Sequence, residues 1–482
     1  MPDTSNLNIL PETGLRPVSR RGFLKSCAAC AACAACGSAV PSAAAREAPA
    51  VPADKAKVRV VFTHPRADLE GWPYINYNYQ PRKEQFLARL GKALPNTEFM
   101  PVTVMKADET RDLLANDSGI DGYVCLLMGI PSAGAARQLL TAGRPVVLVD
   151  DLYGGTGEFL GTYARARAEK LKVVGVSSTR FEDVVQAVRL YEVMRKLRVS
   201  TILDVCERTN RNEPKAIEEV FGTTVRTTGA EEINEAYQKA DKAEAEKYAA
   251  AWVKNAKKVV EPSREEIGRS GLMYIAMRDM MAGRKAQAVD MDCLRLFYGK
   301  KLPAYPCLGF CQLNDDGLVG ACEADLQSTI TMLAMTYLAG RPGYISDPVI
   351  DTSKNQIIYA HCVAPTKVWG PKGQSNPYLI RDHSEDRKGA VVQSLMPIGE
   401  MTTTLKFHPV RKEVIIHQAR TVANIDEDRA CRTKLAAEVK DINKLLGEWN
   451  RFGWHRVTFY GDLRAPVEAF AALTGFQMVV EG

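Results

Sequence analysis

Short apolar runs alternate with amphipathic segments through the first third of the chain. The strand-length runs are residues 58–62, 122–128 and 144–150, and apolar side chains at helical spacing occupy residues 82–94 and 132–142. Strands and helices in repeated alternation predict a parallel sheet with helices on both faces. We therefore expect a first Rossmann-like α/β domain over residues 57–171.

The same alternation resumes after residue 171. The elements expected there are a strand at 172–177, a helix at 181–197, a strand at 199–206, a long solvated helix at 235–260 and a methionine-rich helix at 271–282. This pattern predicts a second Rossmann-like α/β domain over residues 172–300.

Beyond residue 300 the pattern changes to one long helix followed by short strands. The helix is expected at 323–338, and the strands at 356–361, 390–395, 402–407, 413–419 and 456–460, before a closing helix at 465–474 and a strand at 475–480. Regular short strands separated by turn residues are typical of a small β-barrel or sandwich. The predicted fold class is thus α/β, with two Rossmann-like parallel-sheet domains followed by a β-rich, barrel-like C-terminal domain over residues 301–482.

The composition is that of an ordinary globular protein. Of 482 residues, 46% are hydrophobic and 25% are charged. Lys and Arg exceed Asp and Glu by 63 − 57 = 6, but these charges are spread along the chain and not gathered beside aromatic residues, which argues against a nucleic-acid binder. No apolar run reaches the roughly 18 residues needed to span a membrane, so we expect no transmembrane helix.

Residues 1–45 have the order of regions found in an export signal. A polar start is followed by the sequence SRRGFLK at 19–25, by small apolar residues, and by three alanines at 43–45. This order resembles a twin-arginine signal peptide with a small-residue cleavage site. We therefore expect the twin-arginine export machinery as a partner, a periplasmic or otherwise exported location, and a linker rich in Ala and Pro over residues 46–56.

Twelve cysteines could indicate disulfides or a metal site. Four of them lie in the leader, at positions 27, 30, 33 and 36, where they are either a ligand cluster or small apolar residues of the signal. The other eight form no C-x-x-C pair. We interpret them as buried thiols of a protein that folds in a reducing compartment before export.

The most reactive residue types gather in residues 306–365. Glu323 stands at the expected start of a helix, where the helix dipole favours an ionised carboxylate. Asp347 follows an extended run, His361 ends an expected strand, and His455 lies far downstream. Two carboxylates with one or two neutral imidazoles suit Mn²⁺, or another divalent metal, that binds neighbouring oxygen atoms of a substrate.

Each of these residues has an ordinary structural alternative. Glu323 could be a helix-start charge, Asp347 a turn acid before a proline, His361 a satisfied core histidine and His455 a surface histidine. Asp325, two positions after Glu323, should point elsewhere on the helix and is interpreted as structural.

Two further segments could contact a sugar. Residues 381–386 carry His383 and would either reach into the site as a loop or form a solvated hairpin tip. The loop after the first expected strand carries Trp72, Tyr74 and Asn76. It would either present aromatic and amide groups to a polyol or pack as an ordinary loop, since ligands bind at the carboxyl ends of such strands. His383 and Trp72 are therefore candidate substrate-binding residues.

Short segments of the second half resemble those of known sugar isomerases. GACEAD at 320–325 resembles the segment of the L-fucose isomerase family that carries a metal-binding glutamate, and Asp347 stands 24 residues after Glu323, where that family carries its second carboxylate ligand. AHC at 360–362 is similar to the L-arabinose isomerase segment with a ligand histidine. HRVTF at 455–459 resembles the last histidine motif. The resemblance covers about residues 286–482.

The resemblance implies a Mn²⁺-dependent aldose–ketose isomerase that acts on a small sugar through an ene-diol intermediate. It implies that Glu323 and Asp347 are both metal ligands and catalytic residues, which move a proton between C1 and C2 of the sugar. His455 would be the third ligand, and His361 a further ligand or a hydrogen-bond donor to the sugar. Isomerases of this kind assemble with active sites near subunit contacts, which implies a homo-oligomer.

A second class of function fits the same fold. Two tandem α/β domains can close on a sugar without any metal. The alternative is therefore an exported carbohydrate-binding protein that kept the isomerase-like fold and lost the chemistry.

Overall fold

Residues 54–482 are described by the computed structural model, with the exception of residue 133 and residues 209–210. The signal expected at residues 1–45 and nearly all of the linker expected at 46–56 lie outside the described residues, so both stay predictions. The described residues belong to a single unit. Among their helices, none combines the length and the apolar character needed to cross a bilayer.

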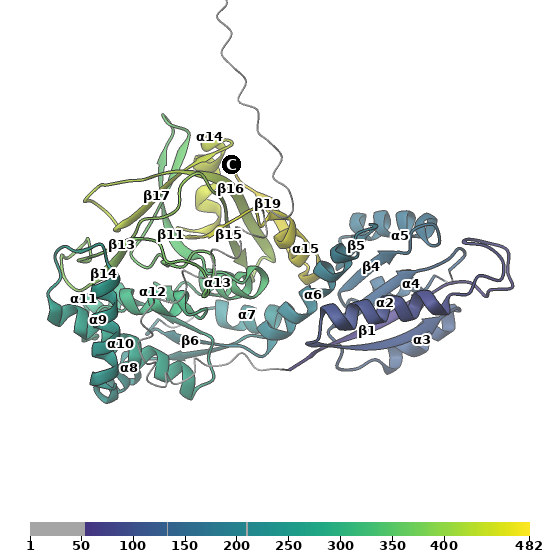
Figure 1. Ribbon diagram of the computed structural model, residues 1–482, viewed down its shortest axis with the longest axis horizontal. Coiled ribbons are helices and arrows are strands. Elements are labelled where there is room, and N and C mark those ends of the chain that lie inside the picture. Colours follow the sequence, from purple (N-terminus) through teal and green to yellow (C-terminus); the bar gives the residue numbers. More distant parts are fainter. Residues whose placement is uncertain (1–53, 133, 209–210) are drawn as a thin grey trace, which may run out of the picture. The chain divides into compact units, whose positions relative to one another are not determined.

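The first layer is a five-stranded parallel sheet (Figure 1). In order across the sheet, its strands are β2 (Thr97–Val104), β1 (Ala56–Thr63), β3 (Gly122–Leu127), β4 (Val146–Asp150) and β5 (Val173–Val176). Its helices are α2 (Gln80–Ala93), α3 (Ala107–Asn116), α4 (Ala135–Thr141), α5 (Thr156–Ala168) and α6 (Phe181–Arg198). The strand order 2-1-3-4-5 is that of a doubly wound α/β fold.

Successive residues of the central strand β3 enter two different cores. Val124 and Leu126 pack in one core with residues of α2 and α6, whereas Tyr123 and Cys125 pack in another with residues of α4 and α5. A strand that is covered on both faces needs apolar residues at every position. This explains why β1, β3 and β4 could be predicted as continuous apolar runs.

One strand belongs to a different sheet from the one we expected. We assigned residues 172–177 to the second α/β unit, but β5 pairs in parallel with β4 and is the last strand of the first sheet. The short apolar run of β5 fits the edge of either sheet, and only its backbone pairing decides between them. The division of the chain into domains at residues 57–171, 172–300 and 301–482 otherwise stays a prediction.

The second layer is a smaller parallel sheet. In order, its strands are β10 (Val319–Cys322), β9 (Ala288–Met291), β6 (Thr201–Val205) and β7 (Thr224–Thr228). The accompanying helices are α7 (Glu213–Phe221), α8 (Ala230–Lys239), α9 (Lys242–Asn255), α10 (Arg264–Gly283), α11 (Cys293–Tyr298) and α12 (Cys307–Asp315). The single helix expected at 235–260 is wrong. Asp241 begins α9 as its N-cap and accepts hydrogen bonds from the backbone N–H groups of Ala243 (2.8 Å) and Glu244 (3.0 Å), which separates α9 from α8.

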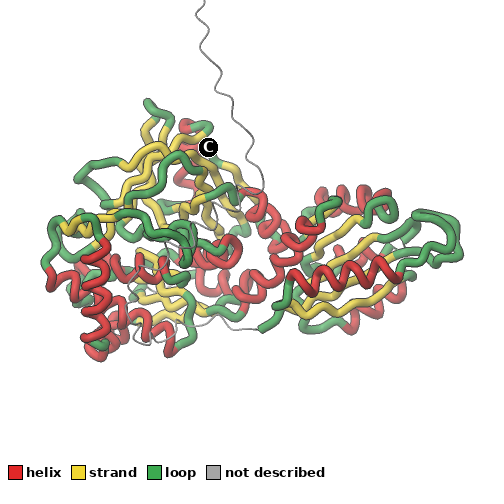
Figure 2. The backbone as a smooth tube through the Cα atoms, viewed as in Figure 1, coloured by secondary structure: helices red, strands yellow, loops and turns green. Residues whose placement is uncertain are grey.

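The third layer is a closed antiparallel barrel (Figure 2). Around the barrel its strands are β15 (Met401–His408), β18 (Arg456–Tyr460), β11 (Tyr344–Asp351), β12 (Gln356–His361), β17 (Thr433–Val439) and β16 (Glu413–Asn424), and the pairing of β16 with β15 closes it. The strand β19 (Gln477–Val480) adds in parallel to β16. A separate short sheet consists, in order, of β14 (Val391–Ser394), β13 (Tyr378–Arg381) and β8 (Lys258–Val259). Closure removes the unpaired edges that an open sheet would expose.

The helix α13 (Leu326–Ala339) joins the second sheet to the barrel. Its buried residues Ile330 and Leu333 share one core with Val319 of β10 and with Phe407 and Phe459 of the barrel strands β15 and β18. It ends at Gly340, whose φ of 66° lies in the left-handed region that glycine adopts easily. The remaining helices are α14 (Ile442–Glu448), a 3₁₀ turn at Trp449–Phe452 and α15 (Arg464–Thr474). The predicted fold class, two parallel-sheet layers followed by a β-rich barrel, is confirmed.

Two buried carboxyl groups stand side by side in the second sheet. Asp204 of β6 and Asp290 of β9 are direct neighbours in the parallel register, and neither is exposed. Arg211 donates to Asp204 at 2.7 Å, whereas Asp290 receives a hydrogen bond from the Thr329 hydroxyl at 2.9 Å. Burial, assisted by the nearby charge of Asp204, raises the pKa of Asp290 to about 7.

We expect Asp290→Asn to stabilise the protein at pH 8 and to have little effect at pH 4. The pKa of Asp290 rises from 3.8 to about 7 on folding, so the stability linked to its protonated form is complete below about pH 4 and is lost as the pH rises through 7. At pH 8 the free energy of unfolding of Asp290→Asn should exceed that of the wild-type protein by about 2–4 kcal/mol. Urea unfolding at both pH values measures it. Asp204→Asn is the contrasting variant, since it deprives Arg211 of its buried partner and should destabilise at both pH values. An unchanged pH dependence in Asp290→Asn would contradict the assignment.

Candidate active site

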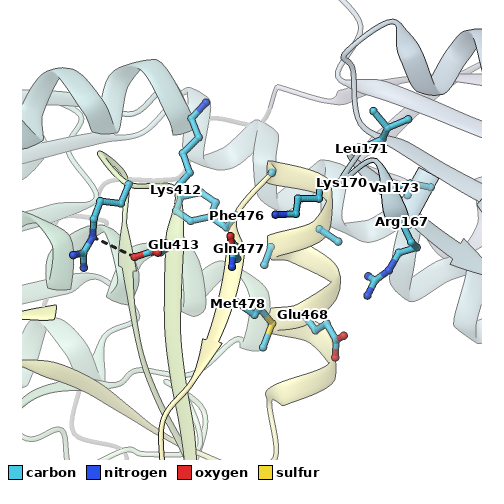
Figure 3. A pocket seen from close by; sticks show the side chains of 14 residues that line it. Arg167, Lys170, Leu171, Val173, Lys412, Glu413, Glu468, Phe476, Gln477 and Met478 are labelled. Carbon is cyan, nitrogen blue, oxygen red and sulfur yellow. Dashed lines mark ion pairs between the residues drawn. The ribbon is translucent and has the colours of Figure 1, made fainter. Parts of the chain in front are cut away.

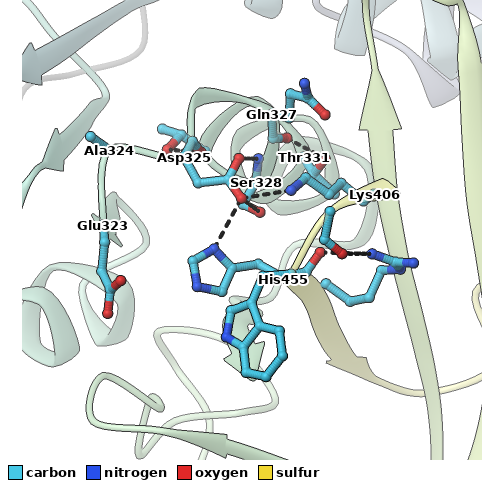
Figure 4. A network of polar contacts seen from close by, with 12 residues as sticks. Glu323, Ala324, Asp325, Gln327, Ser328, Thr331, Lys406 and His455 are labelled. Atoms are coloured by element: carbon cyan, nitrogen blue, oxygen red, sulfur yellow. Dashed lines mark hydrogen bonds and ion pairs between the residues drawn. The ribbon is translucent and has the colours of Figure 1, made fainter. Parts of the chain in front are cut away.

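The turn between β10 and α13 carries the first predicted site residue (Figure 4). The helix begins at Leu326 and not at Glu323 as expected, because Asp325 is its N-cap. The Asp325 carboxylate accepts hydrogen bonds from the backbone N–H of Ser328 at 3.0 Å and from its hydroxyl at 2.9 Å. Glu323 therefore lies before the helix, and the reading of Glu323 as a helix-start charge is wrong.

Burial decides the protonation of Glu323. We expected the helix dipole to favour its ionised form, but burial raises the pKa of Glu323 to about 6. Its carboxylate receives no hydrogen bond from the described residues, and Figure 4 shows it apart from the contacts that Asp325 makes. An acid in this state can both accept and return a proton near neutral pH.

Two arginines hold the backbone of this turn. Arg208 donates to the carbonyl oxygens of Glu323 (2.9 Å) and Ala324 (3.0 Å), and Arg211 donates to that of Ala324 (2.8 Å). Ala324 has a φ of 56°, a left-handed conformation that costs a residue with a Cβ about 1 kcal/mol. The arginines are in turn fixed by carboxylates, Arg208 by Asp292 at 3.0 Å and Arg211 by Asp204. The sequence analysis missed both arginines.

The barrel supplies the other predicted residues from neighbouring strands. Asp347 lies within β11, His361 is the last residue of β12, and His455 immediately precedes β18. β11 pairs with β12 on one side and with β18 on the other, which brings the three side chains to one end of the barrel. β11 continues through Pro348 to Asp351 and pairs with β12 over residues 347–351, whereas β18 pairs only with residues 344–346.

Asp347 is held by three side chains. The Trp454 indole N–H donates to its Oδ1 at 2.6 Å, the Nε2 of His455 lies 3.3 Å from the same oxygen, and the Cys431 thiol lies 3.6 Å from Oδ2. Burial alone would raise the pKa of Asp347, but the hydrogen bonds from His455 and Trp454 and the charge of His455 lower it. Asp347 thus stays ionised, and the reading as an ordinary turn acid is wrong because it lies within a strand.

Asp325 links His455 to the turn. Its Oδ2 lies 3.1 Å from the Nδ1 of His455 and accepts a hydrogen bond from the Lys406 ammonium at 2.6 Å (Figure 4). With Nδ1 hydrogen-bonded to Asp325, the Nε2 of His455 faces Asp347. This is the arrangement in which a carboxylate orients a ligand histidine. Asp325 is structural, as expected, but the expectation that it points away from the site is wrong.

The surroundings of His455 favour a positive charge. Burial alone would lower the pKa of His455, but Asp325 and Asp347 on either side of the ring raise it to about 9. The side chain is 8% exposed, so the reading of His455 as a surface histidine is wrong. A cation is therefore stabilised at this point of the site.

His361 presents an unpaired nitrogen. It is buried, and burial lowers its pKa to about 4, so the ring is neutral. Its Nδ1 accepts the backbone N–H of Cys362 at 3.0 Å, and its Nε2 has no partner among the described residues. The reading of His361 as a satisfied core histidine is therefore wrong. Coordination at Nε2 would shift the ring hydrogen to Nδ1 and cost that one hydrogen bond, about 1 kcal/mol, which is small beside a metal–ligand bond.

The donor atoms present fit a divalent cation. Ligand atoms of Asp347, His361 and His455 all lie within 4.8 Å of one another, and those of Cys322, Glu323 and His361 form a second such group. Two carboxylates and two imidazoles are a donor set that Mn²⁺ accepts. The Nε2 of His361, which has no partner among the described residues, and the surroundings of His455, which favour a positive charge, also support a divalent cation at this site.

The two candidate substrate residues fall in different places. His383 is 5% exposed and not a solvated hairpin tip. Its ring packs near Tyr305, with ring centres 5.5 Å apart, and its Nδ1 lies 3.4 Å from Asp386. Trp72 lies in the loop between β1 and α2, forms a backbone bridge with Ile130 and is 55% exposed. It belongs to the edge of the first sheet, and the structure does not bring it to the Glu323 group.

Three cavities lie away from this chemistry, and one of them, of about 710 Å³, is lined by Trp252, Asp315 and Tyr378, among others. A cavity of about 470 Å³ is lined by residues of α5, β5, α15, β16 and β19 and of the turns beside them, including Arg167, Lys170 and Lys412 (Figure 3). Another cavity of about 510 Å³ lies at the carboxyl edge of the first sheet and includes Arg82 and Asp151, which form an ion pair. None of the three is lined by Glu323, Asp347 or the two histidines. Convergent ligand atoms, and not volume, therefore locate the candidate site.

Relatives among curated proteins carry the name sulfoquinovose isomerase. That of Clostridium sp. (strain MSTE9) is 28% identical over 212 residues, 41% of this chain and 45% of the relative. That of Alkalicoccus urumqiensis is 26% identical over 152 residues, 31% of this chain and 33% of the relative. That of Priestia aryabhattai is 38% identical over 79 residues, 16% of this chain and 18% of the relative. The chain spans less than half the length of each of these relatives. No family model matches the chain.

Proposed function

We propose that this protein is a metal-dependent aldose–ketose isomerase that acts through an ene-diol intermediate. One observation supports the proposal: ligand atoms of Asp347, His361 and His455 lie within 4.8 Å of one another, and those of Cys322, Glu323 and His361 form a second such group that shares His361. The relatives named sulfoquinovose isomerase make sulfoquinovose the first sugar to test.

The cation would be held by Glu323, Asp347 and His455, with His361 as a further ligand or as a hydrogen-bond donor to the sugar. Mn²⁺ in this position would supply Lewis acidity toward the carbonyl oxygen and the neighbouring hydroxyl oxygen of the open-chain sugar. Asp325 and Lys406 would keep the ring of His455 in the orientation that directs Nε2 toward Asp347.

The two carboxylates take different roles according to their surroundings. Burial raises the pKa of Glu323 to about 6, whereas the partners of Asp347 lower the pKa of that group. Pairs of acids whose pKa values are pushed apart are typical of acid–base catalysis. We assign to Glu323 the removal of the proton from C2 and its return to C1, and to Asp347 the role of a permanently ionised ligand.

Removal of the metal tests the proposal. Protein treated with a chelator should lose exchange of the C2 hydrogen with deuterated solvent and should regain it when Mn²⁺ is added. Deuterium incorporation into sulfoquinovose and a panel of other aldoses, followed by NMR, measures this, together with metal content by elemental analysis. Sugar binding with neither bound metal nor exchange would exclude the isomerase and favour the carbohydrate-binding alternative.

Export and assembly belong to the proposal as expectations from the sequence. We propose that the protein is exported by the twin-arginine pathway after folding, with its metal bound, and that it forms a homo-oligomer. The proposal of export rests on residues 1–45, and the proposal of a homo-oligomer rests on the resemblance to L-fucose isomerases.

A further inference from the structure

Three thiols lie close to the candidate site residues. Cys322 immediately precedes Glu323, and its Sγ lies 2.9 Å from the Sγ of Cys293. Cys431 approaches Asp347, as described above. Cys293 and Cys322 are buried, and both are free thiols. Sulfur atoms are ligands for zinc and other thiophilic metals, and are poor ligands for Mn²⁺.

We propose that the site contains a second, softer metal-binding set, formed by Cys322, Glu323 and His361, which takes Zn²⁺ or another thiophilic divalent ion. The sulfur, carboxylate oxygen and imidazole nitrogen of these residues all lie within 4.8 Å of one another. Sulfur, nitrogen and oxygen donors of this kind match the ligand preference of Zn²⁺.

An independent feature points to a ligand at this place. The Nε2 of His361 is buried and has no partner among the described residues. A buried polar atom without a partner is uncommon unless a ligand, ion or water satisfies it. His361 stands between the two groups and belongs to both, so its free nitrogen can serve either set.

Binding of the softer ion releases protons. The Cys322 thiol loses its S–H proton to solvent as the metal–sulfur bond forms, and Glu323 binds as the carboxylate. No oxidation takes place. Because Glu323 and His361 are shared with the set that would hold Mn²⁺, an ion bound through Cys322 withdraws these ligands. Zn²⁺ should therefore inhibit Mn²⁺-dependent exchange.

Cobalt gives a readout that does not depend on turnover. Co²⁺ added to metal-free protein should produce a near-ultraviolet thiolate-to-cobalt charge-transfer band, which Zn²⁺ should remove and Mn²⁺ should not. Cys322→Ser should reduce this band at least tenfold. Cys125→Ala is the matched control, because Cys125 is a buried thiol of β3 in the first sheet, and it should leave the band unchanged.

The outcomes separate this inference from the proposed isomerase. Bound Co²⁺ without a thiolate band, a band that persists in Cys322→Ser, or no Co²⁺ binding at all would overturn the softer set. Absence of Mn²⁺-dependent exchange in the wild-type protein would refute the isomerase alone and leave the cobalt band as expected. Zn²⁺ inhibition that is weaker in Cys322→Ser than in Cys125→Ala would support the shared ligands.

Discussion

Glu323→Gln should slow exchange of the C2 hydrogen by a factor of roughly 10² to 10⁴. Glutamine keeps the length and shape of the side chain but can neither accept nor return a proton. Burial raises the pKa of Glu323 to about 6, near the value at which a proton carrier is most effective in neutral solution. Deuterium incorporation at saturating Mn²⁺ and sugar measures the effect, and bound metal is determined in the same samples.

Folding of this variant should be unaffected. The Glu323 carboxylate accepts no hydrogen bond within the part of the chain that the structure describes, and Arg208 and Arg211 hold its turn through backbone oxygens. Glu158→Gln is the matched control. Burial also raises the pKa of Glu158, but this residue lies on α5 and bonds to Ser132, so exchange should continue at the wild-type rate. Exchange by Glu323→Gln within a few-fold of wild type would remove Glu323 from the mechanism.

Local sequence patterns predicted where strands and helices lie better than which strands pair with one another. β1, β3 and β4 are covered on both faces and read as apolar runs, whereas the edge strand β2 contains Pro101 and exposed Glu98 and was missed. The assignment of β5 failed for a related reason, because membership of a sheet is decided by pairing with β4 and not by the run itself. The spacing of apolar residues indicates which faces of an element are buried. It does not indicate which strand or helix packs or pairs with that element.

For the site, too, the residue types could be predicted from the sequence, but the contacts between distant residues could not. Asp347 and His455 could be proposed from residue type and motif spacing, but the contacts of Asp325 with Lys406 and His455 join residues 81 and 130 positions apart. No local pattern reports such pairs. For Glu323 the sign of the pKa shift was missed because a helix end contributes only about 0.3–1 kcal/mol, whereas a rise from 4.5 to about 6 corresponds to about 2 kcal/mol from burial.

A buried ion-pair network links Glu481 to three strands of the barrel, β18, β16 and β12. Glu481 accepts hydrogen bonds from the Arg456 guanidinium at 3.0 and 3.1 Å and lies 3.0 Å from the Nδ1 of His417, whose Nε2 is 2.7 Å from the Tyr359 hydroxyl. All four side chains are buried. Burial alone would raise the pKa of Glu481, but His417 and Arg456 lower it. Stability from this group is therefore present above pH 4.5, the ordinary pKa of glutamate, and is lost as the pH falls through the lowered pKa.

Glu481→Gln should lower the free energy of unfolding of the barrel by about 3–5 kcal/mol at pH 7, because it leaves the buried guanidinium of Arg456 without a counter-charge. Glu413→Gln is the matched control on the same barrel. Glu413 pairs with Arg451 at 2.8 Å near the surface, where solvent screens the charges, so its loss should cost less than about 1 kcal/mol. Denaturant midpoints at pH 7 compare the two variants. Equal midpoints would mean that water reaches the Arg456 pair. A large difference would show that β18, the strand that follows His455, depends on a charge buried outside the metal-binding group.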